Sequence, residues 1–448
     1  MYRVAESIAS GKNDYAAVID VLNNSIPRIN GKNAGDNIVG NGDLLTETIK
    51  AITALDNSYL FIQGPPGAGK TYTSAHVIIA LLQLGKRVGV TANSHKAIHN
   101  LLDRVESVAA EESFTFRGAK KCSAGNDESY YDGQNIRSVD KNDGITSATQ
   151  FLAGTAWLFA DEQFDQQLDY LIIEEAGQVS VANVVAMGAA AKNIIMVGDQ
   201  MQLGQPIQGV HPGEAGKSIL EFLLGNYATI PPDRGIFLHN TRRLHPSICQ
   251  FISSAFYEGR LEADAGNSKR HLIFDKPVKG IVTDGIYLLT VEHTGCSQKS
   301  TEEGAVIKEC FEALLRQQFH DKDGTVRALG LDDILVVSPY NVQVNHLRGI
   351  LPPGAKVGTV DKFQGQEAPV VLVSMVTSSA EDLPRNIEFL YSKNRLNVAI
   401  SRAQCLAVVV ANPKLLEIPC GNIDQMKLVN TFCWLDDYAS KPKAGGAA

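Results

Sequence analysis

Two adjacent carboxylates close an apolar stretch in the sequence DYLIIEEAGQ. Residues 170–173 have the composition of a buried strand, and Glu174 and Glu175 follow at its end. Paired acids at a strand end can hold a divalent cation and polarise a water molecule that attacks a phosphate. Taken alone, such a pair is more often a solvated strand end. The pair by itself therefore leaves both interpretations open.

The glycine-rich sequence GPPGAGKT changes that balance. It fits the pattern Gly-x-x-x-x-Gly-Lys-Thr, with an apolar run before it and a helical pattern after it. Its glycines let backbone N–H groups converge on phosphate oxygens, and the next helix adds its positive N-terminal end. Lys70 is expected to reach the β- and γ-phosphates, and Thr71 to bind Mg²⁺. The candidate nucleotide-binding residues here are Gly64, Pro65, Pro66, Gly67, Ala68, Gly69, Lys70, Thr71 and Tyr72.

A nucleotide-hydrolysing site of this kind needs a second strand that ends in acid. One carboxylate helps to hold Mg²⁺, and another orients or deprotonates the attacking water. The sequence LIIEEAGQ supplies both acids. With the phosphate loop present, the catalytic interpretation of the pair is favoured over the solvated strand end.

The elements that must position these residues alternate between strand and helix patterns. SYLFIQ, RVGVTAN, LDYLIIEE and NIIMVGD read as strands in the first half, and GIYLLTV, DILVVSPY, APVVLVSMV and CLAVVVA in the second. Such alternation predicts parallel α/β sheets. A proline-rich junction, YATIPPDRG, separates the halves. The polar, aperiodic residues 113–148 are interpreted as an insertion or a long loop.

Composition fits a globular protein of two or three domains. The chain has 448 residues, of which 44% are hydrophobic, and a net charge of −8. This charge argues against a broad basic surface but leaves room for a local groove. No apolar run reaches the ~18 residues of a membrane span, and the N-terminus lacks a signal-peptide core. Location in the cytoplasm and reduced, scattered cysteines are expected.

Nine short sequences occur in an order that resembles the motifs of superfamily 1 helicases. They are IQGPPGAGKT, TANSHKAIHNLL, GTAWLF, EEAGQ, VGDQMQLGQP, NTRRLHPSICQFIS, VVSPYNVQ, VGTVDKFQGQEAPVV and NRLNVAISRAQ. The set most resembles the 5′→3′ branch, which includes the nonsense-mediated-decay RNA helicase and nuclease–helicases. The helicase half of bacterial RecB-like nuclease–helicase fusions is the nearest likeness. The motifs span nearly the whole chain.

The resemblance implies two tandem RecA-like P-loop NTPase domains that bind ATP and Mg²⁺. By motif position, Glu175 polarises water, while Glu174 replaces the usual aspartate of the metal shell, so Thr71 and Glu174 are the metal candidates. Octahedral Mg²⁺ tolerates geometric error poorly, which suggests reduced turnover or a binding-only protein as the alternative. The resemblance makes Lys70, Glu175, Gln202, Arg243 and Arg402 catalytic and adds Arg242, Gly365 and Glu367 to the nucleotide site. Arg242 either stacks on adenine or is solvated.

The same resemblance implies a single-stranded nucleic acid held by loops at strand ends, mainly through its phosphates. The residues that match are Thr91, Asn93, Ser94, His95, Thr155, Pro339, Tyr340, Asn341 and Thr359. Tyr340 or Trp157 could stack on a base, although each is more readily explained as core. DNA is favoured over RNA only by the likeness to nuclease fusions.

The expected organisation has four parts. A lead-in of a short helix and a loop, with partial disorder as the alternative, spans residues 1–43. A first RecA-like domain spans 44–232, a second 233–438, and a disordered tail 439–448. The expected function is strand-dependent ATP hydrolysis that drives 5′→3′ translocation and unwinding by a monomeric core. A nuclease domain or nuclease partner is a further expectation, and no membrane is involved. An ATPase that remodels proteins is the less favoured rival, because it leaves SHKAIHN and SPYNVQ unexplained.

Overall fold

The chain forms two compact units, each built around its own parallel sheet. The computed structural model describes residues 1–205, 209, 211–275, 281–363 and 365–440. Unit 1 comprises Met1–Pro65, Gly69–Gln200 and Gly204–Leu238, and unit 2 comprises Pro66–Ala68, Met201–Leu203 and His239–Ala448. Most of the predicted tail, residues 441–448, lies outside the described residues.

Unit 1 contains an eight-stranded sheet in the order β4-β3-β5-β2-β6-β7-β1-β8, and every neighbouring pair is parallel. Its strands are β1 (Tyr59–Gln63), β2 (Val88–Thr91), β3 (Gly118–Lys121), β4 (Ile136–Val139), β5 (Phe151–Ala153), β6 (Leu168–Ile173), β7 (Ala191–Gly198) and β8 (Gly235–Phe237). Central strands β1, β2 and β6 are apolar, as expected for strands covered on both faces.

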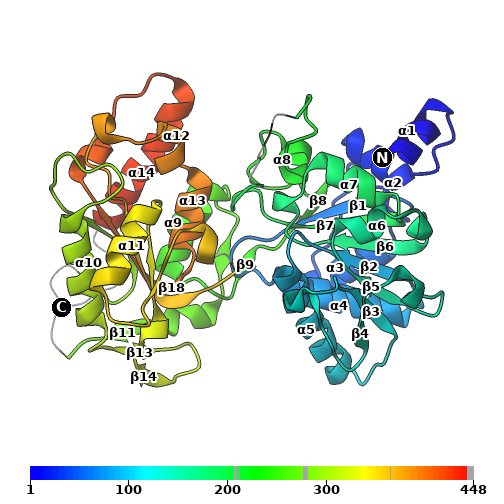
Figure 1. Cartoon of the computed structure of the whole chain (residues 1–448), viewed down its shortest axis with the longest axis horizontal. Coiled ribbons are helices and arrows are strands. Elements are labelled where there is room, and N and C mark those ends of the chain that lie inside the picture. Colours follow the sequence, from blue (N-terminus) through cyan, green and yellow to red (C-terminus); the bar gives the residue numbers. More distant parts are fainter. Residues whose placement is uncertain (206–208, 210, 276–280, 364, 441–448) are drawn as a thin grey trace. The chain divides into compact units, whose positions relative to one another are not determined.

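Helices cover both faces of this sheet (Figure 1). One layer holds α3 (Leu44–Thr53), α4 (Lys70–Gln83) and α5 (His95–Glu111), and α4 packs against both others. The other layer holds α1 (Tyr2–Ala9), α2 (Ala16–Leu22), α6 (Ala156–Ala160), α7 (Val181–Gly188) and α8 (Ile219–Leu224). The layers close the sheet on both sides, so functional residues must lie at its edges or strand ends.

Two sequence interpretations are corrected in unit 1. Residues 113–148 are not a long loop, because they contribute β3 and β4 to the main sheet. These strands are short and carry few apolar residues in a row, so the hydrophobic periodicity of the sequence does not indicate them. The lead-in 1–43 is also structured: Val18 and Val21 of α2 are buried, and α2 packs on β1, β7 and α7.

Unit 2 contains a parallel five-stranded sheet in the order β12-β18-β17-β15-β16. These strands are β12 (Gly285–Thr290), β15 (Ile334–Val337), β16 (Lys356–Gly358), β17 (Ala368–Ser374) and β18 (Ala403–Ala411). Smaller sheets pair β9 (Asn240–Thr241) with β10 (Glu262–Ala263), and join β11 (His271–Ile273), β13 (Gln318–His320) and β14 (Val326–Ala328). Its helices are α9 (Pro246–Phe256), α10 (Thr301–Leu314), α11 (Asn341–Ile350), α12 (Ile387–Leu390), α13 (Lys393–Ile400) and α14 (Ile423–Ser440).

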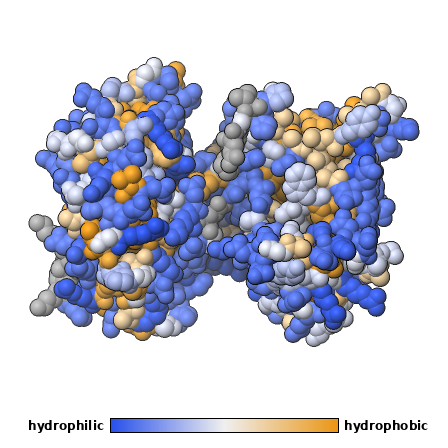
Figure 2. Space-filling model, in the orientation of Figure 1, coloured by the Kyte–Doolittle hydropathy of each residue, from blue (hydrophilic) through white to orange (hydrophobic). Residues whose placement is uncertain are grey.

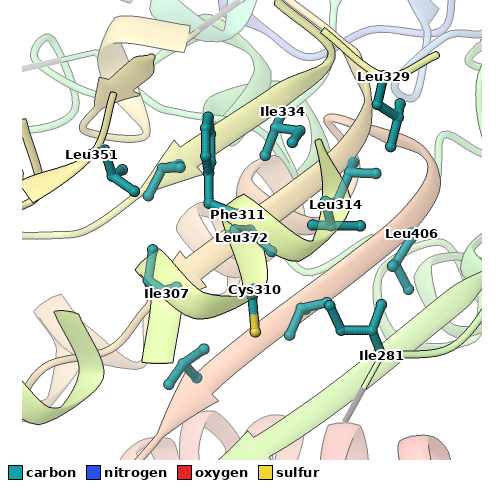
Figure 3. Packing of buried hydrophobic residues seen from close by; sticks show 14 of the residues in the cluster. Ile281, Ile307, Cys310, Phe311, Leu314, Leu329, Ile334, Leu351, Leu372 and Leu406 are labelled. Atoms are coloured by element: carbon teal, nitrogen blue, oxygen red, sulfur yellow. The ribbon is translucent and has the colours of Figure 1, made fainter. Parts of the chain in front are cut away.

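One face of the unit 2 sheet packs against α10 and α11. Phe311 and Leu314 of α10 lie against Leu372 of β17 and Leu406 of β18, as Figure 3 shows. All four side chains are fully buried. The spacing of Ile307, Phe311 and Leu314 places one apolar stripe of α10 on the sheet. The predicted α/β class with parallel sheets is confirmed in both units.

The surface on the face shown in Figure 2 is mainly hydrophilic, with hydrophobic residues in scattered groups. In the part of the chain that the structure describes, no helix has the length and apolarity to cross a membrane. All seven cysteines, each within the described ranges, are free thiols. Most of them are buried.

Candidate nucleotide and nucleic-acid sites

The phosphate loop runs from the end of β1 to the first turn of α4. Gly67 and Gly69 have φ values of 72° and 86°, which only glycine adopts without strain. The left-handed Gly69 caps α4, so the helix begins at Lys70, and Thr71 stands in its first turn. The loop thus directs a helix N-terminus and its unpaired N–H groups to one place, as phosphate binding requires.

Lys70 folds back over the start of the loop. Its Nζ donates a hydrogen bond to the Gly64 carbonyl oxygen at 2.8 Å. A Cβ atom at Gly64 would lie only 2.2 Å from Lys70 Cγ, so glycine is required where the lysine crosses. A bound phosphate would compete with the Gly64 carbonyl for the ammonium group.

The acid pair stands at the end of β6, two strands from β1 in the same sheet. Register pairs Ile173 with Met196 of β7, and Gln63 of β1 with Gly198, so these parallel strands end at one edge. Glu174 is 5% exposed and its N–H donates to the Thr91 carbonyl oxygen. Glu175 is half-buried in the left-handed conformation, with φ 51°. This non-glycine strain is typical of functional positions.

Burial raises the pKa of Glu174 to about 7. The neighbouring Glu175 carboxylate raises it further, while Ser74 and the Lys70 ammonium favour the charged form. Glu174 Oε1 is buried and has no hydrogen-bond partner among the described residues. A buried carboxylate oxygen without a partner is costly unless a cation or water completes it.

The residues of this edge fit a magnesium ion that arrives with its nucleotide. The partnerless Glu174 oxygen and the Thr71 hydroxyl are hard oxygen donors of the kind that Mg²⁺ prefers. Within the described ranges, no cluster of three His, Cys, Asp or Glu residues could hold a metal alone. Phosphate oxygens and waters would therefore supply most of the ligands, as is usual for Mg²⁺.

The raised pKa of Glu174 predicts a pH-dependent cost in the nucleotide-free protein. A carboxyl with a folded pKa of about 7 and an ordinary value of 4.5 destabilises the fold increasingly from pH 4.5 to 7 and fully above pH 7. We expect Glu174→Gln to raise the free energy of unfolding by about 3 kcal/mol at pH 8 and by little at pH 5. Urea unfolding in EDTA measures this difference. Equal effects at both pH values would contradict it, and the half-buried neighbour variant Glu175→Gln is the matched control.

Asp199 follows β7 at the same sheet edge, and Gln202 comes three residues later, in the segment Met201–Leu203 of unit 2. Asp199 is 4% exposed and Gln202 is 7% exposed. Gly198, the last residue of β7, allows the segment after β6 to approach, because a Cβ there would lie 3.0 Å from the N atoms of Ala176 and Gly177. The role of Gln202 in sensing the γ-phosphate stays a prediction.

The second set of predicted nucleotide residues forms a cluster within unit 2. Arg243 makes an ion pair with Glu367 and donates to the Ser401 carbonyl oxygen at 3.2 Å. Gln404 Nε2 donates to Glu367 Oε1 at 2.8 Å, and Arg402 Nη1 donates to the Gln366 carbonyl oxygen at 3.2 Å. Burial opposes the charge of Glu367, but Arg243 and Gln404 outweigh it and lower the pKa of the carboxyl.

The unit 2 structure thus brings Arg243, Arg402 and Glu367 together where β17 and β18 begin. Arg402 is 2% exposed, whereas Arg242 and Gly365 are exposed. Arg395 lies over the Phe389 ring, with 4.1 Å between its guanidinium carbon and the ring centroid. Sequence reasoning missed Gln404, whose only signal is its place two residues after Arg402.

The nucleic-acid candidates of unit 1 stand at the same sheet edge, where β2 and β5 end. Asn93 and Ser94 are exposed and His95 is half-buried, but Thr91 is 1% exposed inside the sheet. The Thr91 side chain is thus buried at the end of β2, and its contact with a nucleic-acid strand stays a prediction. Ser94 Oγ accepts from the Ala97 N–H at 3.1 Å and caps α5. Thr155 is half-buried before α6.

The two aromatic candidates differ. Trp157 of α6 is 86% exposed, so its explanation as a core residue is wrong. Tyr340 is 5% exposed and stacks on Phe389 with ring centroids 5.7 Å apart, so it belongs to the core of unit 2. Pro339 and Thr359 are half-buried, and Asn341 is exposed. These three follow the carboxyl ends of β15 and β16.

Comparisons with known proteins agree with this geometry. One family model described as an AAA domain matches residues 46–221, and another with the same description matches 215–414. The regulator of nonsense transcripts 1 homolog of Drosophila melanogaster is 27% identical over 81% of this chain and 34% of its own length. The DNA replication ATP-dependent helicase/nuclease JHS1 of Arabidopsis thaliana is 25% identical over 84% of this chain and 28% of its own.

Among solved structures, an arterivirus nonstructural protein 10 helicase in complex with DNA has a TM-score of 0.44 and 14% identity. The match covers 80% of this chain and 61% of that one. The present chain spans about a third of the length of the curated relatives named above.

A phosphate loop and an acid pair at one edge of a parallel sheet, followed by a second α/β unit with clustered arginines, are typical of the P-loop NTPase fold with tandem RecA-like domains. The sequence is similar to ATP-dependent helicases and to the regulators of nonsense transcripts, which supports a place in that branch of the superfamily 1 helicases. The finer likeness to bacterial RecB-like fusions stays a prediction.

Proposed function

We propose that this chain hydrolyses ATP, with Mg²⁺, when it binds single-stranded nucleic acid, and that hydrolysis drives 5′→3′ translocation and duplex unwinding. The observation that carries the proposal is the shared edge of the unit 1 sheet. The phosphate loop follows β1, the acid pair follows β6, and the candidate strand-binding loops follow β2 and β5. A bound nucleotide and a bound nucleic-acid strand would thus both act on the loops of this one edge.

In this proposal the residues of unit 1 have distinct tasks. Lys70 leaves the Gly64 carbonyl and pairs with the β- and γ-phosphates, while the first turn of α4 supplies backbone N–H groups. Thr71 and Glu174 hold the metal ion, which neutralises phosphate charge. Glu175 accepts a hydrogen bond from the attacking water and orients it.

The exposed Trp157 supports a base-stacking contact next to the strand-binding loops. The Trp157 side chain is 86% exposed, so its ring face is open to a base. Aromatic stacking tolerates any base and is the usual grip of sequence-independent single-strand binding. Trp157 lies two residues after Thr155, the candidate strand-binding residue that precedes α6.

The finer parts of the proposal rest on family resemblance. They are the 5′→3′ direction, a preference for DNA over RNA, a monomeric core in the cytoplasm, and a nuclease domain or partner. A nucleotide-gated strand binder with weak hydrolysis is the second candidate. The observation that favours it is Glu174, whose longer side chain and pKa of about 7 disfavour a charged metal ligand.

Steady-state ATP hydrolysis, measured with DNA and RNA oligonucleotides of one sequence, tests the proposal. We expect one polymer, DNA by preference, to stimulate turnover at least tenfold. We also expect Trp157→Ala to raise the oligonucleotide concentration for half-maximal stimulation about tenfold, and Trp157→Phe to restore it, because stacking contributes about 1–3 kcal/mol per base.

Two other outcomes would redirect the proposal. ATP-dependent strand binding without stimulated turnover would favour the nucleotide-gated binder. Turnover that no strand affects, with no strand binding, would exclude both candidates and favour an ATPase that acts on proteins.

A further inference from the structure

A buried lysine lies behind the first strand-binding loop of unit 1. Lys120 of β3 is 0% exposed, yet the ammonium group has no carboxylate ion pair among the described residues. A buried cation without a counter-charge costs several kcal/mol, and an apolar side chain such as methionine would fill the position more favourably. Burial lowers the pKa of Lys120 to about 8. Lys120 plays no part in the proposed ATP chemistry.

All three N–H groups of Lys120 are used. Nζ lies 2.7 Å from the Lys121 carbonyl oxygen, 3.2 Å from the Ser129 carbonyl oxygen and 3.1 Å from His95 Nδ1. An ammonium group has three donors and no acceptor. Nδ1 of His95 must therefore accept, and the single proton of the neutral ring must sit on Nε2.

His95 is the first residue of α5, at the sheet edge where the strand is expected. We propose that Lys120 is a positioning residue that fixes the ring proton of His95 on Nε2, so that the ring offers an N–H donor to a phosphate oxygen of the bound strand. The inference rests on the proposed function and deepens it, because it makes His95 a donor contact rather than a cation. The N-terminus of a 17-residue helix adds further attraction for phosphate.

The surroundings keep the ring neutral. The pKa of His95 is lowered, chiefly by burial and to a smaller extent by the charges of Lys120 and His99. The other titratable groups that act on the pair are His99 and Glu128, which act on His95, and Cys122, which acts on Lys120. Asp103 and Tyr131 lie one step further away and contact or act on His99. The same burial and Lys120 charge lower the pKa of His99.

The direction of the hydrogen bond between Lys120 and His95 reverses when the pair of side chains loses a proton. A neutral Lys120 amine keeps two N–H groups for the two carbonyl oxygens, and its lone pair then favours a ring that carries its proton on Nδ1. Nε2 would become an acceptor and repel a phosphate. Because the two groups share a hydrogen bond, this deprotonation is a property of the pair and cannot be assigned to either residue alone.

The test compares Lys120→Met with Lys121→Met in the full chain. Lys121 is the matched control because it carries the same charge one residue along, and its Nζ donates to the Asp140 carbonyl oxygen rather than to a histidine. At pH 7.2 and fixed ionic strength we expect Lys120→Met to weaken single-strand binding about tenfold, as for loss of a hydrogen bond to a charged group. We expect Lys121→Met to change it no more than about threefold. Unfolding by urea should show Lys120→Met to be at least as stable as the wild type.

A pH series separates positioning from a merely structural role. Wild-type affinity should stay level from pH 6 to 7.5 and decline above about pH 8. Lys120→Met should instead bind more tightly as the pH falls, because the ring is released from the Lys120 charge and gains its own proton more readily. In a His95→Ala background both dependences should vanish, and Lys120→Met should add no further loss.

The ring proton can be observed without any nucleic acid. Long-range ¹H–¹⁵N spectra of the full chain labelled in its 10 histidines, with His95 assigned from the His95→Ala spectrum, should show the Nε2–H form at pH 7 and a mixture in Lys120→Met. An Nδ1–H ring in the wild type, or equal affinity of the Lys120 and Lys121 variants, would overturn the inference. If no protein bound a strand, the proposed function would fail, while the spectrum would still report whether Lys120 sets the ring proton.

Discussion

Replacing Glu175 with glutamine should lower the turnover of ATP about a thousandfold while leaving ATP binding nearly unchanged. The residue stands at the end of β6, in a left-handed conformation that the strand end and the segment after it impose. A carboxylate there can accept a proton from the attacking water, whereas an amide can only orient it. General-base catalysis typically contributes 10²–10⁴ in rate, and the amide loses most of that factor.

Glutamine has nearly the same shape as glutamate, so the left-handed turn should survive the substitution. Strand-stimulated hydrolysis and the affinity of a fluorescent ATP analogue, measured on the same preparation, separate chemistry from binding. Glu174→Asp, which restores the usual side-chain length beside it, is the companion variant and should keep or raise turnover. A loss of less than tenfold in Glu175→Gln would show that another group activates the water.

The sequence predicted the site edge well because that edge depends on local chemistry. The glycines of the phosphate loop, the apolar run before Glu174 and the serine that caps α5 each specify their own structure. The same reasoning explains why α/β units with parallel sheets could be predicted for both halves. Each strand there is a short apolar run followed by a helix pattern.

The features that the sequence did not reveal depend on contacts between residues that are far apart in the chain. Gly118–Lys121 reads as polar, yet it pairs with β4 and β5 and buries Lys120 completely. The exposure of Trp157 and the burial of Thr91 also follow from neighbours far along the chain, which no local pattern reports. Periodicity can indicate that a residue lies on a strand, but not whether that strand end is open to solvent.

Replacing Arg243 with alanine should lower turnover by about a thousandfold or more, because an arginine that neutralises transferring phosphoryl oxygens contributes 10³–10⁵ in rate. In unit 2 this guanidinium is already held in place, by the Glu367 carboxylate and the Ser401 carbonyl oxygen. Such restraint lowers the entropy cost of using the planar, permanently charged group in the transition state. Arg243→Lys should recover little, since a lysine cannot reproduce the two-nitrogen contact. The affinity for the ATP analogue should change by less than about tenfold, because the contribution is made mainly in the transition state.

The adjacent residue provides the control for charge. Arg242 is exposed, so Arg242→Ala removes the same charge from the same segment without disturbing the Glu367 pair. If Arg242 stacks on adenine, its loss should raise KM for ATP about fivefold with kcat unchanged, which is the magnitude of a cation–π contact; if it is solvated, neither constant should move. Similar losses of kcat in Arg242→Ala and Arg243→Ala would contradict a specific role for Arg243 and point to a general effect of positive charge. A selective loss in Arg243→Ala would instead show that turnover needs this particular guanidinium of the unit 2 cluster.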